Sequence, residues 1–502
     1  MFHTVQKIGL LLGPIAAMAL FSTLPEYYVD TQKALIPLTF SAKTTLCITL
    51  WMAIWWLTEA IDISITALLP IALFPLLDIA DIKATTAPYA SHLIFLFMGG
   101  FIIALSMQRW KLDQRLANLI LGMTGNRPML ILAGFMLATA LLSGFISNTA
   151  TTALMLPMGL SIITLYTHYH DNTFANRDQH NFARCLLLGI AYAASLGGTL
   201  TIIGTAPNLF LVGFLETGLD AAYQTQVSFL QWLLMAAPLV LIFLPIIWLL
   251  LSKLVFPFDH QQLVQSANQH GNREQPMSSG ETITLTVFIF TVLLWMLRPW
   301  LQSLSFDWAG SPVTPLKDLS DPGIAMLSAL LLFIIPVNLK QRIFVMDWPT
   351  AQKLPWGIFI LFGGGLTLAQ AIQNNGVAEF IAAQSIFLPA LPEYVFVLII
   401  CFAVIFLTEL TSNTATTATL VPILASMAIG MGIHPYLLVF PATFAASFAF
   451  MMPIATPPNA IVFGSGYLSI PDMCRAGLSL NLIGMILITL FTYWLLKPAL
   501  GI

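Results

Sequence analysis

Charged residues are scarce in this chain of 502 residues: Asp, Glu, Lys and Arg together make up 8% of it, whereas hydrophobic residues make up 58%. In a soluble globular protein roughly a quarter of the residues are charged, so this composition excludes a soluble globular protein. It is typical of an integral membrane protein that crosses the bilayer many times.

The chain also lacks the patterns that mark several kinds of catalytic or metal site. It has only four cysteines, and no two of them have the spacing of a metal site or a disulfide framework. It contains no phosphate-cradling Gly-Lys loop, no zinc-spaced His-Glu set and no Ser-His-Asp arrangement. We therefore expect neither an enzyme nor a partner of nucleic acids.

Long apolar runs divide the rest of the chain. A membrane-spanning helix needs about 20 such residues, and about eleven runs qualify. They lie near residues 8–24, 44–58, 62–80, 91–108, 183–216, 227–256, 282–299, 322–337, 355–373, 435–465 and 476–498. Two more apolar segments, 129–166 and 393–429, are each interrupted by polar residues near the middle. Each can form either two full spans or one re-entrant hairpin.

The interruptions are two copies of one motif. Ser-Asn-Thr-Ala-Thr-Thr-Ala occupies residues 147–153 and returns 265 residues later at 412–418, and a proline follows each copy. Hydroxyl-rich backbone is tolerated at membrane depth only where it is buried in protein or lines a water-filled cavity. Two copies therefore predict two halves of one binding site, as in secondary transporters.

Other segments repeat as well. Residues 96–100 match 361–365 at the same offset, and the Pro-Asn segment 204–208 matches 455–459 at an offset of 251. Ser, Thr and Gly at such positions can simply permit close helix packing, but matched pairs favour a binding site. An odd number of crossings separates the two motifs, so the halves have opposite orientation and form inverted repeats.

The positions of the basic residues favour hairpins over full spans. With a cytoplasmic N-terminus and two hairpins, most of the 19 Lys and Arg residues fall in inside segments. We therefore expect a multi-pass protein of the plasma (inner) membrane with its N-terminus in the cytoplasm.

The chemistry of the motifs predicts sodium and an anion. No Lys or Arg lies within them to neutralise an anion, whereas Ser, Thr, Asn and freed carbonyl oxygens suit sodium. Helix N-termini after each break would donate amide hydrogens to a carboxylate. Asn148 and Asn413 can each offer an oxygen to a cation and amide hydrogens to an anion.

Four stretches resemble the divalent anion:sodium symporter family, and the resemblance covers nearly the whole chain. They are Trp-Leu-Thr-Glu-Ala-Ile at 56–61, Thr-Ala-Leu-Leu-Pro at 66–70, Leu-Thr-Glu at 407–409 running into Ser-Asn-Thr at 412–414, and Thr-Pro-Pro-Asn at 456–459. The resemblance implies an all-α membrane protein of about 11 transmembrane helices plus two re-entrant hairpins. It also implies a homodimer in the lipid bilayer that works as an elevator, in which a scaffold domain holds the dimer and a transport domain slides.

The resemblance also implies site residues. The first sodium site would use Ser143, Ser147, Asn148 and Gly204, and the second would use Thr408, Ser412, Asn413 and Ala455. Substrate would contact Ser147, Asn148, Thr149, Ser412, Asn413 and Thr414, with specificity set at Thr205, Thr456 and Pro457. Many dicarboxylate members read Gly-Ser-Pro-Pro-Asn where this chain reads Gly-Thr-Ala-Pro-Asn at 204–208, which leaves dicarboxylate, tricarboxylate and sulfate open.

The expected domain order follows the repeats. Residues 1–126 and 282–390 would form the scaffold domain, residues 127–256 and 391–502 the transport domain, and residues 257–281 a cytoplasmic linker. The expected function is sodium-coupled symport of a C4 dicarboxylate such as succinate, malate or fumarate.

Several alternatives stay open. They are a sodium-independent dicarboxylate exchanger and a sodium/sulfate or sodium/citrate symporter on the same fold. The sodium-independent exchangers of the family show charged replacements at the ion positions; this chain has none, which favours sodium coupling. A channel is disfavoured by the paired hairpins and by the lack of charged rings.

Two acids among the apolar segments have competing interpretations. Glu409 is either a functional group of the ion site, as intramembrane acids commonly are, or a structural hydrogen-bond acceptor in the hairpin. Glu59, with Asp62, is expected to end a helix at the membrane interface.

Overall fold

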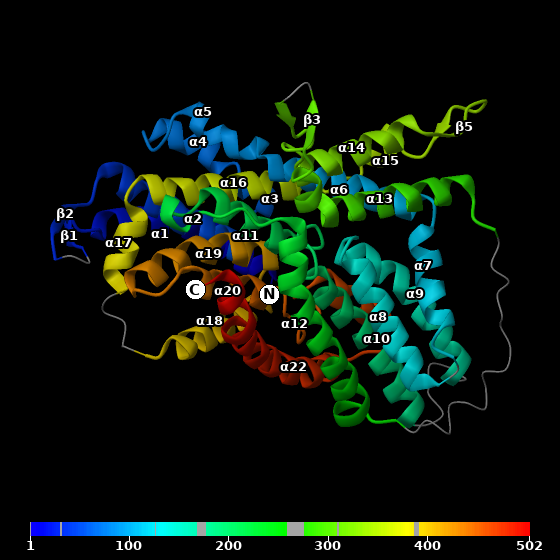
Figure 1. Ribbon diagram of the computed structural model, residues 1–502. Helices are drawn as coiled ribbons and strands as arrows, with labels where there is room; N and C mark the ends of the chain where they lie inside the picture. The colour runs from blue at the N-terminus through cyan, green and yellow to red at the C-terminus, as the bar shows by residue number, and fades with distance from the viewer. Residues whose placement is uncertain are drawn as a thin grey trace.

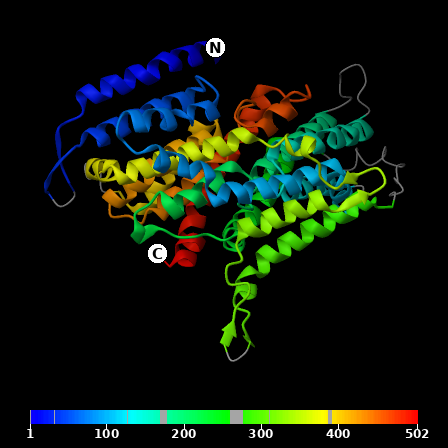
Figure 2. The same cartoon turned by 90° about the horizontal axis from the view of Figure 1, so that it is seen from above.

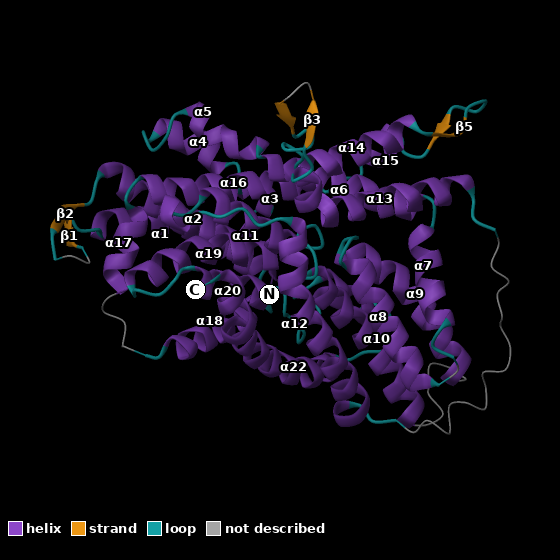
Figure 3. Ribbon diagram, viewed as in Figure 1, coloured by secondary structure: helices purple, strands orange, loops and turns teal. Residues whose placement is uncertain are grey.

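Helices form nearly all of the structure, a computed structural model that describes residues 2–30, 33–125, 127–167, 177–258, 276–308, 311–385 and 391–501. Figure 3 shows the few strands as three small hairpins at the periphery. They are the antiparallel pairs β1 (Tyr27–Val29) with β2 (Leu35–Pro37), β3 (Phe306–Trp308) with β4 (Ser311–Val313), and β5 (Pro336–Asn338) with β6 (Ile343–Phe344). Most of the expected linker 257–281 lies outside the described residues.

The first half of the chain holds the helices up to α12. They are α1 (Phe2–Thr23), α2 (Phe40–Thr58), α3 (Ile63–Thr66), α4 (Leu69–Leu76), α5 (Ile82–Thr86), the 3-10 turn η1 (Ala87–Ala90), α6 (His92–Arg109), α7 (Leu112–Gly122), α8 (Pro128–Ser143), α9 (Asn148–Thr167), α10 (Arg177–Gly198), α11 (Ala206–Thr217), the 3-10 turn η2 (Ala221–Tyr223), α12 (Phe229–Leu249) and the π-helical turn η3 (Leu250–Val255).

The second half begins at α13. Its helices are α13 (Ser279–Gln302), α14 (Asp321–Ile334), α15 (Trp348–Ala351), α16 (Trp356–Asn374), α17 (Val377–Ser385), α18 (Glu393–Thr408), α19 (Asn413–Gly430), α20 (Tyr436–Ala446), α21 (Pro457–Phe463), α22 (Ile470–Phe491), the π-helical turn η5 (Thr492–Leu496) and α23 (Lys497–Leu500).

Seven helices within the described ranges are long and apolar enough to cross a membrane, and five shorter apolar helices accompany them. The prediction of a multi-pass helical membrane protein is confirmed. The predicted single span 62–80 is wrong in detail, because the chain there forms the two short helices α3 and α4. Asp62 accepts a hydrogen bond from the Ser64 amide and so begins α3. The apolar run divides at Ala67 and Leu68, just before Pro70 in the first turn of α4.

Polar caps set the start of three long helices. Ser228, Ser278 and Ser469 each accept a hydrogen bond from the backbone three residues later, and the side chain at that later position bonds back to the cap. Such capping boxes satisfy amides that a helix start leaves free. They begin α12, α13 and α22 just before strongly apolar sequence.

Both polar heptads lie at the turn of a helix–turn–helix hairpin. The first hairpin is α8 with α9, and the second is α18 with α19, so each Ser-Asn-Thr triplet forms the tip. Each hairpin is followed by a broken helix: α10 and α11 in the first half, α20 and α21 in the second. The interrupted segments 129–166 and 393–429 therefore each fold as a pair of helices with the polar heptad at the turn.

The two repeats interlock. Helix α21 of the second repeat packs against α9 and α10 of the first, and α11 of the first packs against α19 and α20 of the second. The end of each broken helix thus contacts the hairpin of the opposite repeat. This exchange brings four segments that are distant in sequence to one place.

The remaining helices form a layer over this assembly. Figure 1 shows α16, α6, α14 and α13 running across the upper part of the molecule, above α8, α10, α12 and α22. In Figure 2, α1 lies along one edge and the green helices α13 and α14 lie along the other. Gly99 lets α6 approach α14, because an added Cβ would lie 2.6 Å from the Ala325 backbone. The repeated segment 96–100 therefore serves close packing.

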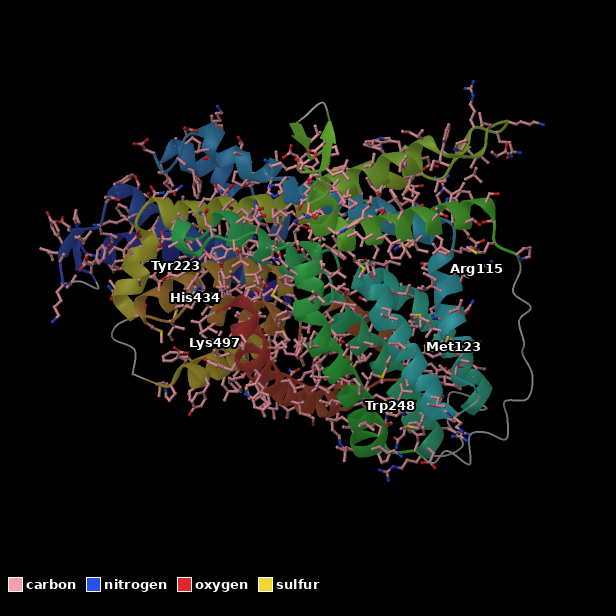
Figure 4. All side chains as sticks on the ribbon, viewed as in Figure 1. Arg115, Met123, Tyr223, Trp248, His434 and Lys497 are labelled. Atoms are coloured by element: carbon pink, nitrogen blue, oxygen red, sulfur yellow. The ribbon has the colours of Figure 1, made fainter. Side chains whose placement is uncertain are left out.

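Side-chain contacts also join elements that are distant in sequence, and Figure 4 labels Arg115, Trp248, Tyr223 and His434, which take part in three of them. Arg115 of α7 forms an ion pair with Glu281 of α13 at 2.9 Å. Trp248 of α12 donates to the Met129 carbonyl of the first hairpin at 3.0 Å. Tyr223 and His434, which connect to different repeats, pack ring against ring with centroids 5.2 Å apart.

Candidate functional site

A cavity of about 500 Å³ lies where the two hairpin tips meet the two helix breaks. Its lining includes every residue that the sequence assigned to substrate or specificity. These residues are Ser147, Asn148, Thr149, Thr205, Ser412, Asn413, Thr414, Thr456 and Pro457. Residues from four separate segments are thus brought together, as inverted repeats predict.

Three helices of more than two turns begin at this cavity. Helix α9 begins at Asn148, α19 at Asn413 and α11 at Ala206, and all three residues line the cavity. The first amides of a helix have no partner within it, and the helix dipole adds partial positive charge there. The cavity therefore presents donors to an anion although no Lys or Arg is among its described lining residues.

Below each tip, a buried hydroxyl orients the asparagine. In the first repeat, Ser143 Oγ donates to Asn148 Oδ1 at 2.7 Å and also contacts the Ala194 carbonyl at 2.7 Å. The single hydroxyl hydrogen of Ser143 cannot form a full hydrogen bond to both oxygens. A cation shared by these oxygens would relieve the competition.

The second repeat contains the same arrangement. Thr408 Oγ1 lies 2.7 Å from Asn413 Oδ1 and 3.1 Å from the Ala446 carbonyl. The two hydroxyls are fully buried. Three oxygens gathered in each repeat by different segments suit a sodium ion, which takes oxygen ligands.

A second asparagine in each repeat stabilises the break in the helix by hydrogen bonds to backbone carbonyls. The amide of Asn208 donates to the carbonyls of Gly198 and Thr201, at 3.0 and 2.8 Å. The amide of Asn459 donates to Ala449 and Met452, at 3.1 and 3.0 Å. These bonds satisfy carbonyls that the break frees from the helix.

Unpaired oxygens accompany the breaks. The buried Oδ1 atoms of Asn208 and Asn459 and the hydroxyls of Ser195 and Ser447 have no hydrogen-bond partner within the described chain. Buried polar atoms are usually paired. Their occurrence at corresponding positions of both repeats points to ligands or water that the site binds in use.

The two repeats differ in the space around their asparagines. An added Cβ on Gly198 would lie 2.3 Å from Asn148 Oδ1, and one on Gly204 would lie 2.4 Å from the Gly198 carbonyl oxygen. The corresponding residues of the second repeat are Ala449 and Ala455, which carry that methyl group. The first site is therefore built more tightly around glycine backbone.

Glu409 supports the second break. Its carboxylate accepts hydrogen bonds from the amides of Phe450, Met451 and Met452 at 2.8–2.9 Å, and from the Asn481 side chain at 2.7 Å. Three of these donors belong to the segment between α20 and α21 and the fourth, Asn481, to α22, so the carboxylate bonds to the broken helix rather than within its own hairpin. Gly144 stands at the matching position of the first repeat.

The sequence did not single out every lining residue. Part of the wall is formed by Glu59 at the end of α2, Phe101 of α6 and Ile358 of α16, all outside the polar motifs. Leu410, Thr411 and Ile454 complete it beside the second tip and break. Glu59 does end α2, as expected, but it also faces the cavity. Nothing in the sequence repeat indicates this wall, because it has no counterpart in the motifs.

Comparison with known proteins agrees with this geometry. Residues 32–500 match the family model described as the sodium:sulfate symporter transmembrane region. The chain belongs to this family of divalent anion:sodium symporters. It is 38% identical over its whole length to the sodium-dependent dicarboxylate transporter SdcS of Staphylococcus saprophyticus, covering 93% of that protein. It is 40% identical to SdcS of Staphylococcus aureus strain MRSA252, with the same coverage.

More distant solved structures share the fold of this symporter family member. The YdaH transporter of Alcanivorax borkumensis superposes with a TM-score of 0.63 at 14% identity, covering 100% of this chain and 99% of the other. MtrF of Neisseria gonorrhoeae gives 0.60 at 14% identity, covering 98% and 94%. At this identity the likeness concerns the fold alone.

Proposed function

We propose that this symporter family member carries a small divalent anion, a C4 dicarboxylate such as succinate, malate or fumarate, together with sodium. The observation that carries the proposal is the pair of equivalent oxygen clusters, Ser143 with Asn148 and Thr408 with Asn413, beneath one cavity without basic residues. The names of the relatives, sodium-dependent dicarboxylate transporters, support the substrate class.

Coupling follows from the asparagines. Asn148 and Asn413 each direct Oδ1 toward a buried hydroxyl and also line the cavity. Sodium bound at the oxygen side would supply the positive charge that the cavity lacks, and the amide side would contact the carboxylate. An anion therefore binds well only after sodium has neutralised the site.

We infer that transport uses an elevator motion. The moving part would comprise residues 127–256 and 391–502, and residues 1–126 and 282–390 would form the scaffold of a homodimer. Support comes from the cavity wall, because Glu59, Phe101 and Ile358 lie in the scaffold ranges whereas the tips and breaks lie in the transport ranges. The membrane would be the plasma membrane, with the N-terminus in the cytoplasm.

Uptake of labelled succinate into proteoliposomes tests the function. The purified protein is given an inward sodium gradient, with an equal choline gradient as the control. We expect succinate to accumulate above its external concentration only with sodium. Succinate exchange that persists without sodium would instead identify an exchanger, and sodium-driven uptake of sulfate or citrate but not succinate would overturn the dicarboxylate assignment.

A further inference from the structure

One acid stands in the wall of the transport cavity, on the scaffold side. Glu59 is exposed at the end of α2 and lines the cavity opposite the motif segments. Its carboxylate has no hydrogen-bond or ion-pair partner among the described residues, although its backbone amide bonds to the Trp55 carbonyl. A free carboxylate is unexpected in a cavity for a dianion, because like charges repel.

Local structure does not explain why Glu occupies this position. Its φ of 47° and ψ of 41° are left-handed, a conformation that favours glycine or asparagine at the end of a helix. The negative end of the α2 dipole lies at the same place, so an acid there is also unfavourable electrostatically. Positions that break two local preferences without a compensating contact are commonly functional.

We propose that Glu59 is a cation-attracting group of the transport cycle, which stabilises the sodium-loaded, anion-free cavity. This inference rests on the proposed function. Two sodium ions without their anion place two positive charges beside a cavity whose described lining contains no other acid. The Glu59 carboxylate offsets part of that charge until a dianion arrives.

The charge balance gives the proposal a distinctive signature. Once the dianion is bound, two sodium ions and the anion sum to zero, so Glu59 attracts the ions about as much as it repels the anion. Glu59 should therefore strengthen sodium binding to the empty cavity and weaken anion binding to the sodium-loaded cavity. The free energy of the complete complex should stay nearly unchanged, because its bound charges sum to zero.

The test compares Glu59→Gln with the unaltered protein, purified in detergent. Binding of ²²Na⁺ is measured without anion, and binding of labelled succinate is measured at saturating sodium. We expect Glu59→Gln to weaken sodium binding by up to about fivefold per ion, the upper bound set by one unit charge at about 4 Å in water. Succinate binding to the sodium-loaded protein should become tighter.

Two further variants serve as controls. Asp78→Asn removes another exposed acid with a left-handed φ, 54°, that does not line the cavity, and it should leave both affinities unchanged. Glu59→Asp keeps the charge and should restore sodium binding.

Opposite changes in the two affinities would support the proposal, because structural damage would weaken both. Unchanged sodium binding, or weakening of both ligands, would overturn it while leaving the symporter assignment intact. Absence of ²²Na⁺ binding in the unaltered protein would instead refute the proposed function itself.

Discussion

At the residue scale, the two proposed ion sites differ by single methyl groups. Asn208 and Asn459 donate to the carbonyls of Gly198 and Ala449, which identifies these two residues as equivalents. An added Cβ at Gly198 would lie 2.3 Å from Asn148 Oδ1, which Ser143 already fixes by a hydrogen bond. The asparagine of the first site therefore has no room to accommodate alanine at this position.

We expect Gly198→Ala to displace the Asn148 amide and to weaken sodium binding at the first site by tenfold or more, about 1.4 kcal/mol. The sodium dependence of succinate uptake in proteoliposomes measures this effect. Ala449→Gly is the matched control, since it removes a methyl group and should retain most activity. Wild-type sodium dependence in Gly198→Ala would exclude Asn148 Oδ1 from the site.

The two threonines proposed to set specificity, Thr205 and Thr456, also differ from each other. Thr456 accepts a hydrogen bond from the Asn459 amide and so caps α21, whereas Thr205 begins α11 without a side-chain cap. The Thr205 hydroxyl is therefore available to a ligand in the cavity that both residues line.

We expect Thr205→Ser to change the ranking of succinate, malate and sulfate in competition assays while the sodium requirement stays intact. The reason is that the serine hydroxyl lacks the methyl group that restricts its rotation and narrows the cavity. Thr456→Ser keeps its cap and should change the ranking less. An unaltered ranking in Thr205→Ser would remove this residue from the specificity role.

At the element scale, the second break depends on one carboxylate. Glu409 accepts four hydrogen bonds, three of them from consecutive backbone amides. Glu409→Gln replaces one acceptor oxygen by a donor that faces an amide. We expect it to lower the free energy of unfolding by about 1–3 kcal/mol and to reduce uptake.

Thermal unfolding in detergent and succinate uptake measure both effects. Glu393→Gln is a suitable control, because Glu393 begins the same helix and is half-buried, with an ion pair to Lys497. If Glu409→Gln melts and transports like the unaltered protein, the carboxylate does not hold the break.

The elements that the sequence predicted best are those whose motifs are repeated along the chain. The hairpins and broken helices could be predicted because their polar motifs occur twice within apolar sequence. The division into the short helices α3 and α4 could not, since hydropathy does not register the break at Ala67 and Leu68 before Pro70. The hydrogen bonds of Asn208 and Asn459 to the broken helices could not be predicted from the Pro-Asn segments, because the accepting carbonyls belong to the backbone and have no sequence signal.

At the scale of the whole molecule, the sequence predicted which motif residues meet but not what faces them. The residues proposed to bind substrate all line one cavity, as the inverted repeats implied. The opposing wall of Glu59, Phe101 and Ile358 depends on how α2, α6 and α16 pack. Interlocking of α11 and α21 with opposite repeats is likewise a tertiary feature, since neither helix carries a signal for its partner.

The proposed motion can be tested across the boundary between scaffold and transport ranges. His92 at the start of α6 lies in the scaffold range and Glu216 of α11 in the transport range, and their side chains pair at 3.2 Å between Nε2 and Oε2. Sliding of one part past the other must separate these two residues. The pair therefore marks a contact that a covalent link would hold closed.

We expect the double variant His92→Cys/Glu216→Cys to lose succinate uptake when a short bifunctional thiol reagent joins the two cysteines. A reductant that cleaves the reagent should restore uptake. The native Cys47, Cys185, Cys401 and Cys474 are first replaced by serine, and each single variant treated with the reagent controls for modification alone. Full uptake by completely cross-linked protein would contradict the elevator, because α6 and α11 would then not need to separate during transport.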